Sequence, residues 1–509
     1  MKKVILLLLL FICLKLYAQH SVKSSGNNLP PALSSIREQD LHSDLFELAS
    51  DSMRGRRAGT SDELRAAAWL AQQAQKAGLE PAGDNGTYFQ FFPLVRITVN
   101  DNSTIKINGS ELKLWKDAWV VNYDNPYPPR FNNYPGEANF SGNILWLPSL
   151  ADTIKPQING SIVAIKIIPP TSALAHNVNF DDVSYAFTAV RQQTSVLKRH
   201  GAKAVILVTD DRTELALKQY LSNSFQKGLY SIDDGGVLTE EHFPVILVRS
   251  NKALAIQQPG ANIQAYLHSG RFIYPSINVV AKVPGTDAGL KNEYVLFSGH
   301  HDHDGVELPL NGDSIWNGAD DNSSVSVALL AIGRAFVKQP ARRSALFVWH
   351  GAEERGLLGS QWYIQHPTVK KEAIAVVING DMIGRNNLDS AALLGVTKPH
   401  RNSMDAVNAA FQANQQVAHF KVDTLWDNAA HPEDWYFRSD HLPYAQAGIP
   451  AIFFSTLLHG DYHMPADEAS RISYPKLKRM TDWMYATGWA IANTAKRPAL
   501  DIDNKTAGK

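Results

Sequence analysis

The spacing of hydrophobic and polar residues changes along the chain, and these changes mark the predicted elements. The segment "SDELRAAAWLAQQAQKAGLEP", residues 61–81, carries apolar side chains at the spacing of a helix face, with a start at Ser61 to Leu64 and a stop at Gly78. From residue 273 onward, short apolar runs alternate with polar loops and helical segments. This repeated order of strand, loop and helix predicts a layered α/β domain, with a mixed, largely parallel sheet flanked by helices.

Residues 107–269 have a different texture. Short β-rich runs such as "GNILWLP", "SIVAIKII", "AVILVT" and "FPVILVRS" accompany one helical segment, "YAFTAVRQQTSVLKRHGAK". The segment contains no cluster of histidines and acids with metal-ligand spacing. We interpret it as a separate β-rich module, either a binding or lid module or a structural insertion. It separates residues 19–106 from a second part of the main domain, residues 270–500.

The first residues, "MKKVILLLLLFICLKLYAQH", have the layout of a secretory signal peptide over residues 1–18, with cleavage near Ala18. The apolar run is too short for a membrane span. The one cysteine, Cys13, lies inside this segment and follows Ile12, where a lipoprotein signal has a small residue. We expect an exported protein, periplasmic or secreted, whose mature chain has no transmembrane span and no cysteine. Any metal ligands in the mature chain would then have to be His, Asp or Glu.

Composition changes this picture little. The 509 residues suggest two or three structural units, and 44% hydrophobic with 19% charged residues is typical of a globular protein with a sizeable core. Lys and Arg number 49, as do Asp and Glu, so no net charge favours a nucleic-acid partner.

Polar residues follow four apolar runs of the C-terminal half. Each run ends in residues that bind metals or transfer protons: "EYVLFSGH" in His300, "SALFVWHGAEE" in Glu353 and Glu354, "AIAVVINGD" in Asp381, and "IPAIFFSTLLHGDYH" in His459 and His463. In open α/β sheets, ligands bind beyond the carboxyl ends of the strands. These endings therefore predict one site at one edge of the sheet.

A fifth segment, "NGADDNSSVSVALLAIGRAFVK", places Asp320, Asp321 and Asn322 before an amphipathic helix. These residues suit a helix N-cap, and a carboxylate there can also face a metal. Each candidate taken alone has an ordinary interpretation as a buried histidine, a turn or a solvated helix start. Together they match a two-zinc hydrolase, which needs a bridging carboxylate, further His and carboxylate ligands, and a base.

Five segments in order, "SGHHDHDG", "NGADDNSSVS", "GAEERGLLGS", "INGDMIG" and "GDYHMPADE", resemble the co-catalytic zinc exopeptidase family that includes bacterial leucyl aminopeptidases and glutamate carboxypeptidase. "ASDSMRGRRAGT" and "YFQFFPL" resemble the N-terminal part of that family. Residues 107–269 resemble a protease-associated domain, which some members carry between the two halves of the peptidase domain. The likeness covers nearly the whole mature chain and implies the zinc-dependent exopeptidase fold.

The resemblance implies two Zn²⁺ per chain and a role for each of seven residues. One zinc would be held by His300 and Asp381 and the other by Glu354 and His463, with Asp321 bridging, Glu353 as general base, and Asp302 hydrogen-bonded to His300. His301 and His303 are expected in the pocket wall. The sequence departs from the family pattern at His301 and at Val325, where a glycine is common, and both departures concern local packing.

We expect from this a secreted metallo-aminopeptidase that acts on peptides with a free N-terminus. The site is rich in acid, which suits a charged amine better than a carboxylate. The alternatives are a carboxypeptidase or dipeptidase, a single-zinc glutaminyl cyclase, and a non-catalytic receptor-like homologue. The motifs lack the arginine cluster of carboxypeptidase-type relatives, although Arg385 and Arg438 are unplaced.

Side-chain preference is suggested by residues 421–448. This segment holds four aromatic residues, Trp426, Trp435, Tyr436 and Phe437, which fit either an apolar substrate site or ordinary packing. Asp440 and His441 follow and are expected to lie behind the metal ligands.

Overall fold

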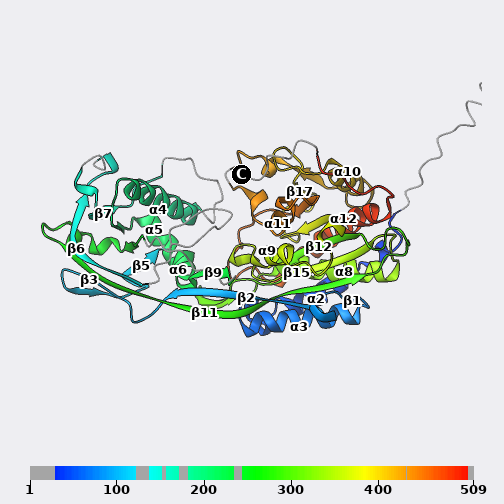
Figure 1. Cartoon of the computed structure of the whole chain (residues 1–509), viewed down its shortest axis with the longest axis horizontal. Helices are drawn as coiled ribbons and strands as arrows, with labels where there is room; N and C mark the ends of the chain where they lie inside the picture. The colour runs from blue at the N-terminus through cyan, green and yellow to red at the C-terminus, as the bar shows by residue number, and fades with distance from the viewer. Residues whose placement is uncertain are drawn as a thin grey trace, which may run out of the picture.

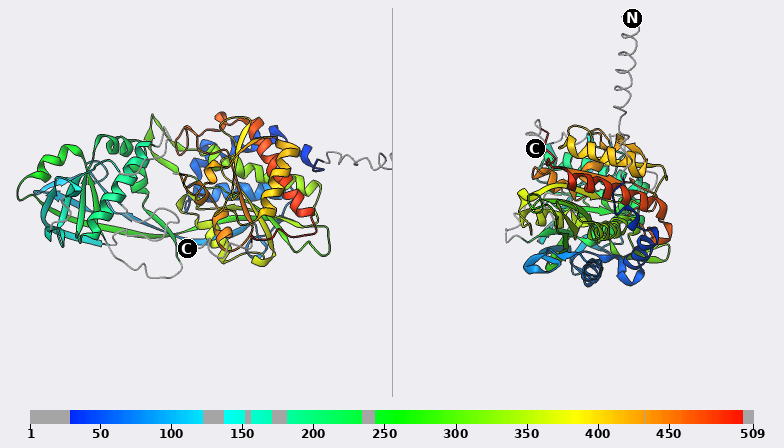
Figure 2. Two further views of the ribbon diagram at one scale, coloured as in Figure 1. Left: turned by 90° about the horizontal axis from the view of Figure 1, so that it is seen from above. Right: turned by 90° about the vertical axis from the view of Figure 1, so that its right-hand side faces the viewer.

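The computed structural model describes residues 29–121, 137–151, 156–170, 181–233, 243–431 and 433–501. The predicted signal peptide, residues 1–18, lies outside them. Among the described residues, no helix has the length and apolar character needed to cross a membrane. Figures 1 and 2 show an elongated molecule of two lobes, joined along β2 (Phe89–Val99) and β11 (Asn262–Val283).

The larger lobe is built on a mixed sheet with a parallel centre. Four neighbouring strands run parallel, in the order β15 (Ser344–His350), β12 (Tyr294–His300), β16 (Ile374–Gly380) and β19 (Ala451–Ser455). The antiparallel neighbours are β11 beside β15 and β17 (Ser390–Leu394) beside β19. The predicted largely parallel sheet is confirmed. Its four central strands correspond to the four apolar runs that are followed by candidate ligands in the sequence.

Helices cover both faces of this sheet, which explains why its strands are continuous apolar runs. In β12, Val295 and Phe297 pack in the same core as α8 (Ser324–Lys338) and α12 (Tyr474–Asn493). The side chain of Leu296, between them, points to the opposite face, where α9 (Leu358–Gln365) and α11 (His441–Gln446) lie. Successive strand residues are thus buried on opposite sides, and no face of the central strands is left for water.

The predicted N-terminal helix is present as α3 (Ser61–Lys76). The Thr60 hydroxyl accepts the backbone N–H of Asp62 at 3.2 Å, which caps the first turn. Gly78 follows the last turn with φ +85°, a conformation that glycine adopts without strain. The helix packs Trp69 and Leu70 into the main core.

The start of α8 differs from its predicted cap. No side chain caps this helix, and two of the polar residues before it, Asp320 and Asn322, bond instead to backbone at and beyond the end of β16. Asp320 accepts the backbone N–H of Gly384 at 2.6 Å, and Asn322 Nδ2 donates to the carbonyl of Gly380 at 3.1 Å. The capping interpretation of these residues is therefore wrong, because Asp320 and Asn322 connect the segment before α8 to the end of β16 and the loop after it.

Val325, where the family pattern has a glycine, is fully buried at the start of α8. A Cβ on Gly299 would lie 2.5 Å from Val325 Cγ1, and a Cβ on Gly380 would lie 3.0 Å from the same atom. The valine fits because two strand residues facing it lack side chains. This departure is therefore accommodated without disturbing the strand ends.

The smaller lobe has its own sheet. Its strands follow the order β6 (Glu137–Leu147), β7 (Ile162–Lys166), β8 (Ala204–Val208), β10 (Val245–Val248) and β5 (Ala118–Val121), of which only β5 is antiparallel to its neighbour. Helix α4 (Asp181–Arg199) packs on β8 and corresponds to the predicted helical segment. Each quoted β-rich run of the sequence forms one of these strands.

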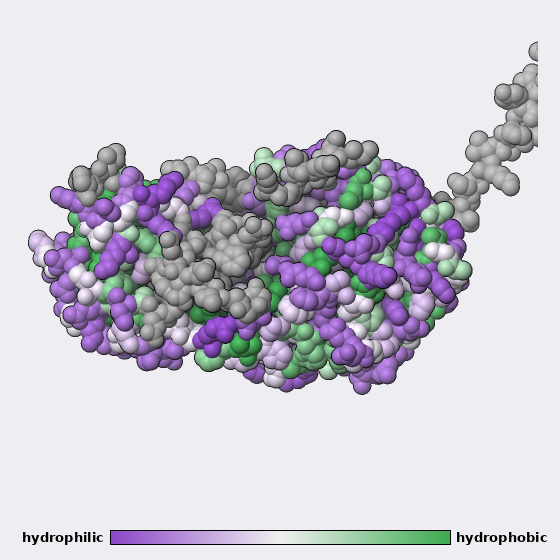
Figure 3. All heavy atoms as spheres, in the orientation of Figure 1, coloured by the Kyte–Doolittle hydropathy of each residue, from purple (hydrophilic) through white to green (hydrophobic). Residues whose placement is uncertain are grey.

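One strand belongs to both lobes. Residues 262–268 of β11 pair with β6 in the smaller lobe, and residues 269–279 pair with β2 in the larger one. The boundary predicted between residues 269 and 270 thus falls inside a continuous strand. On the face drawn in Figure 3, hydrophilic residues predominate over both lobes and hydrophobic residues are scattered among them.

Candidate metal centre

The predicted ligands come together beyond the carboxyl ends of the four parallel strands. His300 is the last residue of β12, and Asp381 directly follows β16. The loops after β15 and β19 carry Glu354 and His463, and Asp321 precedes α8. Parallel neighbours end at the same edge of a sheet, so five distant segments deliver their side chains to one place.

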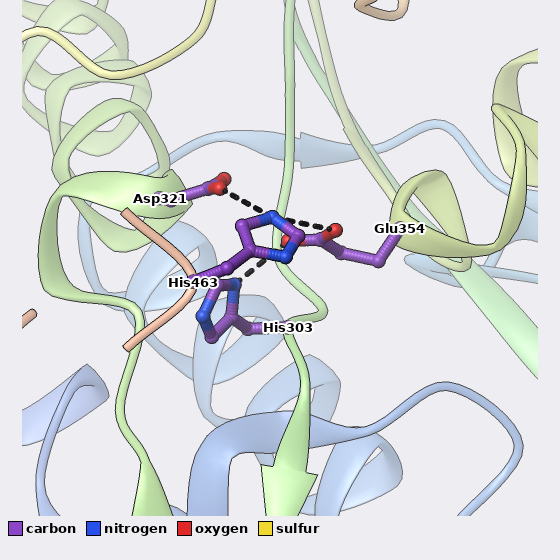
Figure 4. Close-up of side chains that lie close together, drawn as sticks. All are labelled: His303, Asp321, Glu354 and His463. Atoms are coloured by element: carbon purple, nitrogen blue, oxygen red, sulfur yellow. Dashed lines mark hydrogen bonds and ion pairs between the residues drawn. The ribbon is translucent and has the colours of Figure 1, made fainter. Parts of the chain in front are cut away.

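Asp321 lies between two histidines. Its Oδ1 is 3.2 Å from His300 Nε2, and its Oδ2 is 3.2 Å from His463 Nε2. Asp381 Oδ1 lies 3.5 Å from His300 Nε2, and Glu354 Oε2 lies 3.2 Å from His463 Nε2. Figure 4 shows Asp321 and Glu354 on either side of the His463 ring. Two groups of ligand-type atoms therefore share one carboxylate.

The donor set fits zinc. Three groups have ligand-type atoms within 4.8 Å of one another: His300 with Asp321 and Asp381, His300 with Glu353 and Glu354, and His463 with His303, Asp321 and Glu354. His300 Nε2 is buried and has no hydrogen-bond partner among the described residues, as expected of a nitrogen that donates its lone pair to a cation. The described residues include no cysteine, so imidazole nitrogen and carboxylate oxygen are the zinc ligands available among them, and a shared carboxylate suits two adjacent cations.

Burial and charge separate the two neighbouring glutamates. Burial, followed by the carboxylates of Asp381 and Glu354, raises the pKa of Glu353 well above its usual range. Burial also opposes ionisation of Glu354, but His463 and His303 together outweigh it and lower the pKa of Glu354 to about 2. At His300, burial opposes the charged ring, and the carboxylates of Glu353 and Asp381 raise its pKa. The pKa values of the two adjacent glutamates are thus shifted in opposite directions.

Asp302 contacts its predicted partner, His300, and also Glu353. Its backbone carbonyl lies 3.1 Å from His300 Nδ1, whereas its carboxylate is 3.8 Å from that nitrogen. The carboxylate instead accepts the backbone N–H of Glu353 at 3.0 Å. A carbonyl beside Nδ1 keeps the proton there and leaves Nε2 free to bind metal.

The two remaining histidines of "SGHHDHDG" do not line the cavity, so their assignment to the pocket wall is wrong. His301 is fully buried, and its backbone N–H donates to the carbonyl of His350 at 2.9 Å. His303 Nδ1 lies 2.7 Å from Glu354 Oε1, the contact drawn in Figure 4. His303 was missed as a candidate site residue. Its position in the sequence does not indicate whether its side chain contacts a proposed metal ligand or lines the pocket.

Left-handed backbone surrounds the site. Ala352, Met382 and His463 have φ angles of 52°, 55° and 50°, in a region that residues other than glycine rarely adopt. Such conformations persist where the surrounding structure enforces them, and they concentrate at functional sites. Gly318, before Asp321, has φ +55°, and a Cβ there would lie 2.2 Å from the Asp321 carbonyl oxygen.

A cavity of about 370 Å³ opens over these side chains. Its lining joins the site residues Asp321, Glu353, Glu354, Asp381 and His463 to Leu357, Met382, Trp435, Leu458 and Tyr462, and to Val183 and Phe187 of α4. Both lobes therefore border the cavity. Of the four predicted aromatic residues, Trp435 lines it, whereas Tyr436 stacks on the His400 ring at 4.2 Å.

The two unplaced arginines have different surroundings. Arg438 lines the cavity, with Nη1 3.1 Å from Glu433 Oε2 and Nη2 donating to the Tyr462 hydroxyl at 3.0 Å. Arg385 pairs with Asp461 at 2.5 Å and does not line the cavity. Among the residues that the structure describes, the cavity lining thus has one arginine, and the neighbouring Glu433 balances its charge.

Asp440 is buried behind the ligands, as expected. Burial raises its pKa to about 7, and the Asp381 carboxylate adds to the shift. His441 is buried beside it and stacks on Phe453 at 4.8 Å.

Comparison with known proteins agrees with this geometry. Peptidase family M28 matches residues 278–488. The chain is 29% identical to aminopeptidase YwaD of Bacillus subtilis over 36% of this chain and 39% of YwaD, and 28% identical to leupeptin-inactivating enzyme 1 of Streptomyces exfoliatus over 48% and 54%. It thus spans about half or less of these curated relatives.

The fold is similar to that of BSAP, a zinc aminopeptidase from Bacillus subtilis, with a TM-score of 0.59 and 18% identity over 92% of this chain and 99% of that one. An aminopeptidase from Aneurinibacillus sp. strain AM-1 gives a TM-score of 0.57 at 19% identity, over 92% and 98%. The segment matched by the family contains all five predicted ligands and Glu353. Residues 278–488 of the chain therefore match peptidase family M28, and the fold of most of the chain is similar to that of solved aminopeptidases.

Proposed function

We propose that the protein is an exported, two-zinc aminopeptidase that removes residues singly from the free N-terminus of peptides. The observation that carries the proposal is the position of Asp321, whose two oxygens face two different histidines at 3.2 Å each. The names of the curated relatives, aminopeptidases among them, support the same reaction class.

In this proposal, His300 and Asp381 hold one zinc, Glu354 and His463 hold the other, and Asp321 bridges them. Bound zinc supplies a polarised substrate carbonyl and a water with a lowered pKa. The chain supplies the rest: fixed imidazole tautomers, a buried cavity, and a base. A metal-free preparation should regain two zinc ions per chain on dialysis, and about one per chain would favour the single-zinc cyclase instead.

Glu353 is the proposed general base. It lines the cavity, its pKa is raised by burial and by neighbouring carboxylates, and its backbone is held by Asp302. A raised pKa suits a group that accepts a proton from water and passes it to the leaving amine. Glu353→Gln should keep near-normal zinc content and lose about 10²–10⁴-fold in kcat. Activity that survives this change would require another base.

The direction of cleavage is inferred from charge. Four carboxylates line the cavity floor, from Asp321, Glu353, Glu354 and Asp381, and the nearby Arg438 is paired with Glu433. Bound zinc would offset the charges of the three ligand carboxylates, so Glu353, which is not a proposed ligand, is the carboxylate that would attract a substrate ammonium. Helix α4 of the smaller lobe borders the cavity and narrows one side, which favours a chain terminus over the middle of a chain.

Arg438 is the one observation that favours a carboxypeptidase. Four versions of one peptide separate the possibilities: unmodified, N-acetylated, C-amidated, and both, each assayed with and without a zinc chelator. An aminopeptidase cleaves the unmodified and C-amidated forms and loses both with chelator. A carboxypeptidase cleaves the N-acetylated form and fails on the C-amidated one. Zinc binding without cleavage of any form would favour a receptor-like role.

Export and the inserted module complete the proposal. Residues 1–18 act as a cleaved signal peptide, and residues 107–269 act as a protease-associated-like domain that shapes the entrance to the site. The N-terminal sequence of protein recovered outside the cytoplasm should begin near residue 19.

A further inference from the structure

Lys227 connects the smaller lobe to the metal centre. It is the last residue of α6 (Ser222–Lys227), yet its side chain lies buried against the larger lobe, with 5% exposed. Its Nζ is 2.5 Å from Asp304 Oδ1 and 3.3 Å from Glu307 Oε1. A lysine is buried this deeply only where carboxylates replace its hydration, so the pairing determines where Asp304 points.

The other oxygen of Asp304 faces a proposed zinc ligand. Asp304 Oδ2 lies 3.1 Å from His463 Nδ1, on the opposite side of the ring from the Nε2 that faces Asp321 and Glu354. A carboxylate beside one imidazole nitrogen holds the proton there, orients the ring, and leaves the second nitrogen as a metal donor. Lys227, Asp304 and His463 thus form a continuous chain of contacts from one lobe to the proposed metal site.

Further contacts limit the freedom of Asp304. Arg355 Nη2 lies 3.1 Å from the same Oδ1 that Lys227 contacts, and Arg57 Nε donates to the Asp304 backbone carbonyl at 2.9 Å. Two cations on one oxygen fix the rotation of the carboxylate, so its second oxygen stays directed at His463.

The smaller lobe presents Lys227 in a fixed position. The carbonyl of Lys227 accepts Arg96 Nε at 2.7 Å, and a Cβ on the following Gly228 would lie 2.1 Å from the carbonyl oxygen of Ile97. Tyr230, two residues further along, lies under the Arg355 guanidinium at 5.3 Å. The turn after α6 is therefore packed against the larger lobe, and the ammonium group cannot swing away without moving it.

The geometry points to Lys227 as a positioning residue for the metal centre, through which the smaller lobe orients His463 by way of Asp304. This inference rests on the proposed function. The inference implies that the two zinc sites depend differently on Lys227. The affinity of the site formed by Glu354 and His463 depends on it, whereas the affinity of the site formed by His300 and Asp381 does not. The smaller lobe is then part of the metal site and not only a wall of the cavity.

The test measures zinc binding, without any substrate. Metal-free full-length Lys227→Met protein is titrated with Zn²⁺ in competition with a chromophoric chelator. We expect two sites, one with the affinity of the unmodified protein and one weakened about 10–100-fold, the usual effect of losing a group that orients a ligand. Lys252→Met is the matched control, because Lys252 belongs to the same lobe but is 35% exposed and pairs only loosely with Asp117, at 3.8 Å.

Two more variants separate positioning from a general loss of structure. Lys227→Arg keeps a cation beside Asp304 and should restore part of the lost affinity. Asp304→Asn keeps the shape but not the charge, and should weaken the same single site even if Lys227→Met fails to fold. Thermal unfolding of each metal-free variant reports whether the fold itself has changed.

The outcomes are distinct. Equal affinity of both sites in Lys227→Met and Asp304→Asn, or equal weakening of both sites in folded protein, overturns the inference. Failure of the unmodified protein to bind two zinc ions overturns the proposed metal centre itself, which is a different result.

Discussion

The carboxylate of Asp302 accepts the backbone N–H of Glu353 at 3.0 Å, while the carbonyl of the same aspartate faces His300 Nδ1 at 3.1 Å. One residue therefore positions both a proposed zinc ligand and the proposed base. Burial raises the pKa of Asp302 to about 6, against the charge of His300. The side chain acts on the base and the main chain acts on the ligand, so substitution can separate the two effects.

Asp302→Asn keeps an oxygen that accepts the Glu353 N–H, and Asp302→Ala removes it. We expect the alanine variant to lose about 10–100-fold in kcat and the asparagine variant to lose less, because the hydrogen bond positions the base. Zinc content should stay near normal in both, since His300 is held by a backbone carbonyl. Equal loss in the two variants would mean that the charge of Asp302, and not its hydrogen bond, is required.

Gly318→Ala should disrupt the centre. The added Cβ would lie 2.2 Å from the Asp321 carbonyl oxygen and 2.4 Å from His303 Cγ, so the loop that carries the bridging carboxylate must move. Gly312→Ala is the control, because it has φ +92° with nothing within 4 Å of the new Cβ. Both variants carry the cost of a left-handed alanine, about 1 kcal/mol. Only Gly318→Ala should also lose zinc, as measured by metal analysis of the folded protein.

Asp482 should make the protein less stable as pH rises from about 4 to 6. Burial raises its pKa to about 6, although Lys478 Nζ lies 2.6 Å away. Between its usual pKa and 6, the folded state keeps a proton that the unfolded state releases, so the free energy of unfolding falls with rising pH and is constant above 6.

Asp482→Asn is neutral at every pH and should therefore gain up to about 3 kcal/mol at pH 7, with the gain absent below pH 4. Denaturant unfolding across this range provides the measurement. Asp389→Asn, on an 85% exposed side chain, should change stability by less than about 0.5 kcal/mol. A gain for Asp482→Asn that is independent of pH would contradict the explanation.

Phe187→Ala tests whether the smaller lobe contributes to substrate choice. Phe187 lines the cavity from α4 and is 43% exposed, so an apolar substrate side chain can cover it. We expect kcat/KM to fall about 10-fold for leucyl substrates and little for alanyl ones, because the lost contact is apolar area. Phe46→Ala, equally exposed but on a helix of the larger lobe outside the cavity lining, should change neither. Uniform loss on both substrates would indicate damage to the site instead of altered preference.

The positions of the proposed ligands were predictable from local pattern. A strand buried on both faces is a continuous apolar run, and a polar residue that ends such a run must lie at the edge of the sheet. His300 and Asp381 follow this rule. Because β12 and β16 are parallel neighbours, His300 Nε2 and Asp381 Oδ1 lie 3.5 Å apart. The strand pattern could not indicate that the acids before α8 leave the helix uncapped. The orientation of Asp320 depends on its hydrogen bond to the loop after β16, which is distant in the sequence.

What the sequence by itself determined is the set of elements and the chemistry at their ends, since each element is specified by its own burial pattern. Contacts between elements were decided only by the tertiary structure. Lys227 and Asp304 are 77 residues apart and belong to different lobes, and neither has a local signal of its partner. The contact of His303 with Glu354 and the reach of Phe187 to the cavity depend likewise on how two lobes pack around a shared strand. The burial pattern of each element determines which positions in the sequence are polar. Which other polar group each of these residues contacts is determined only by the packing of the elements against one another.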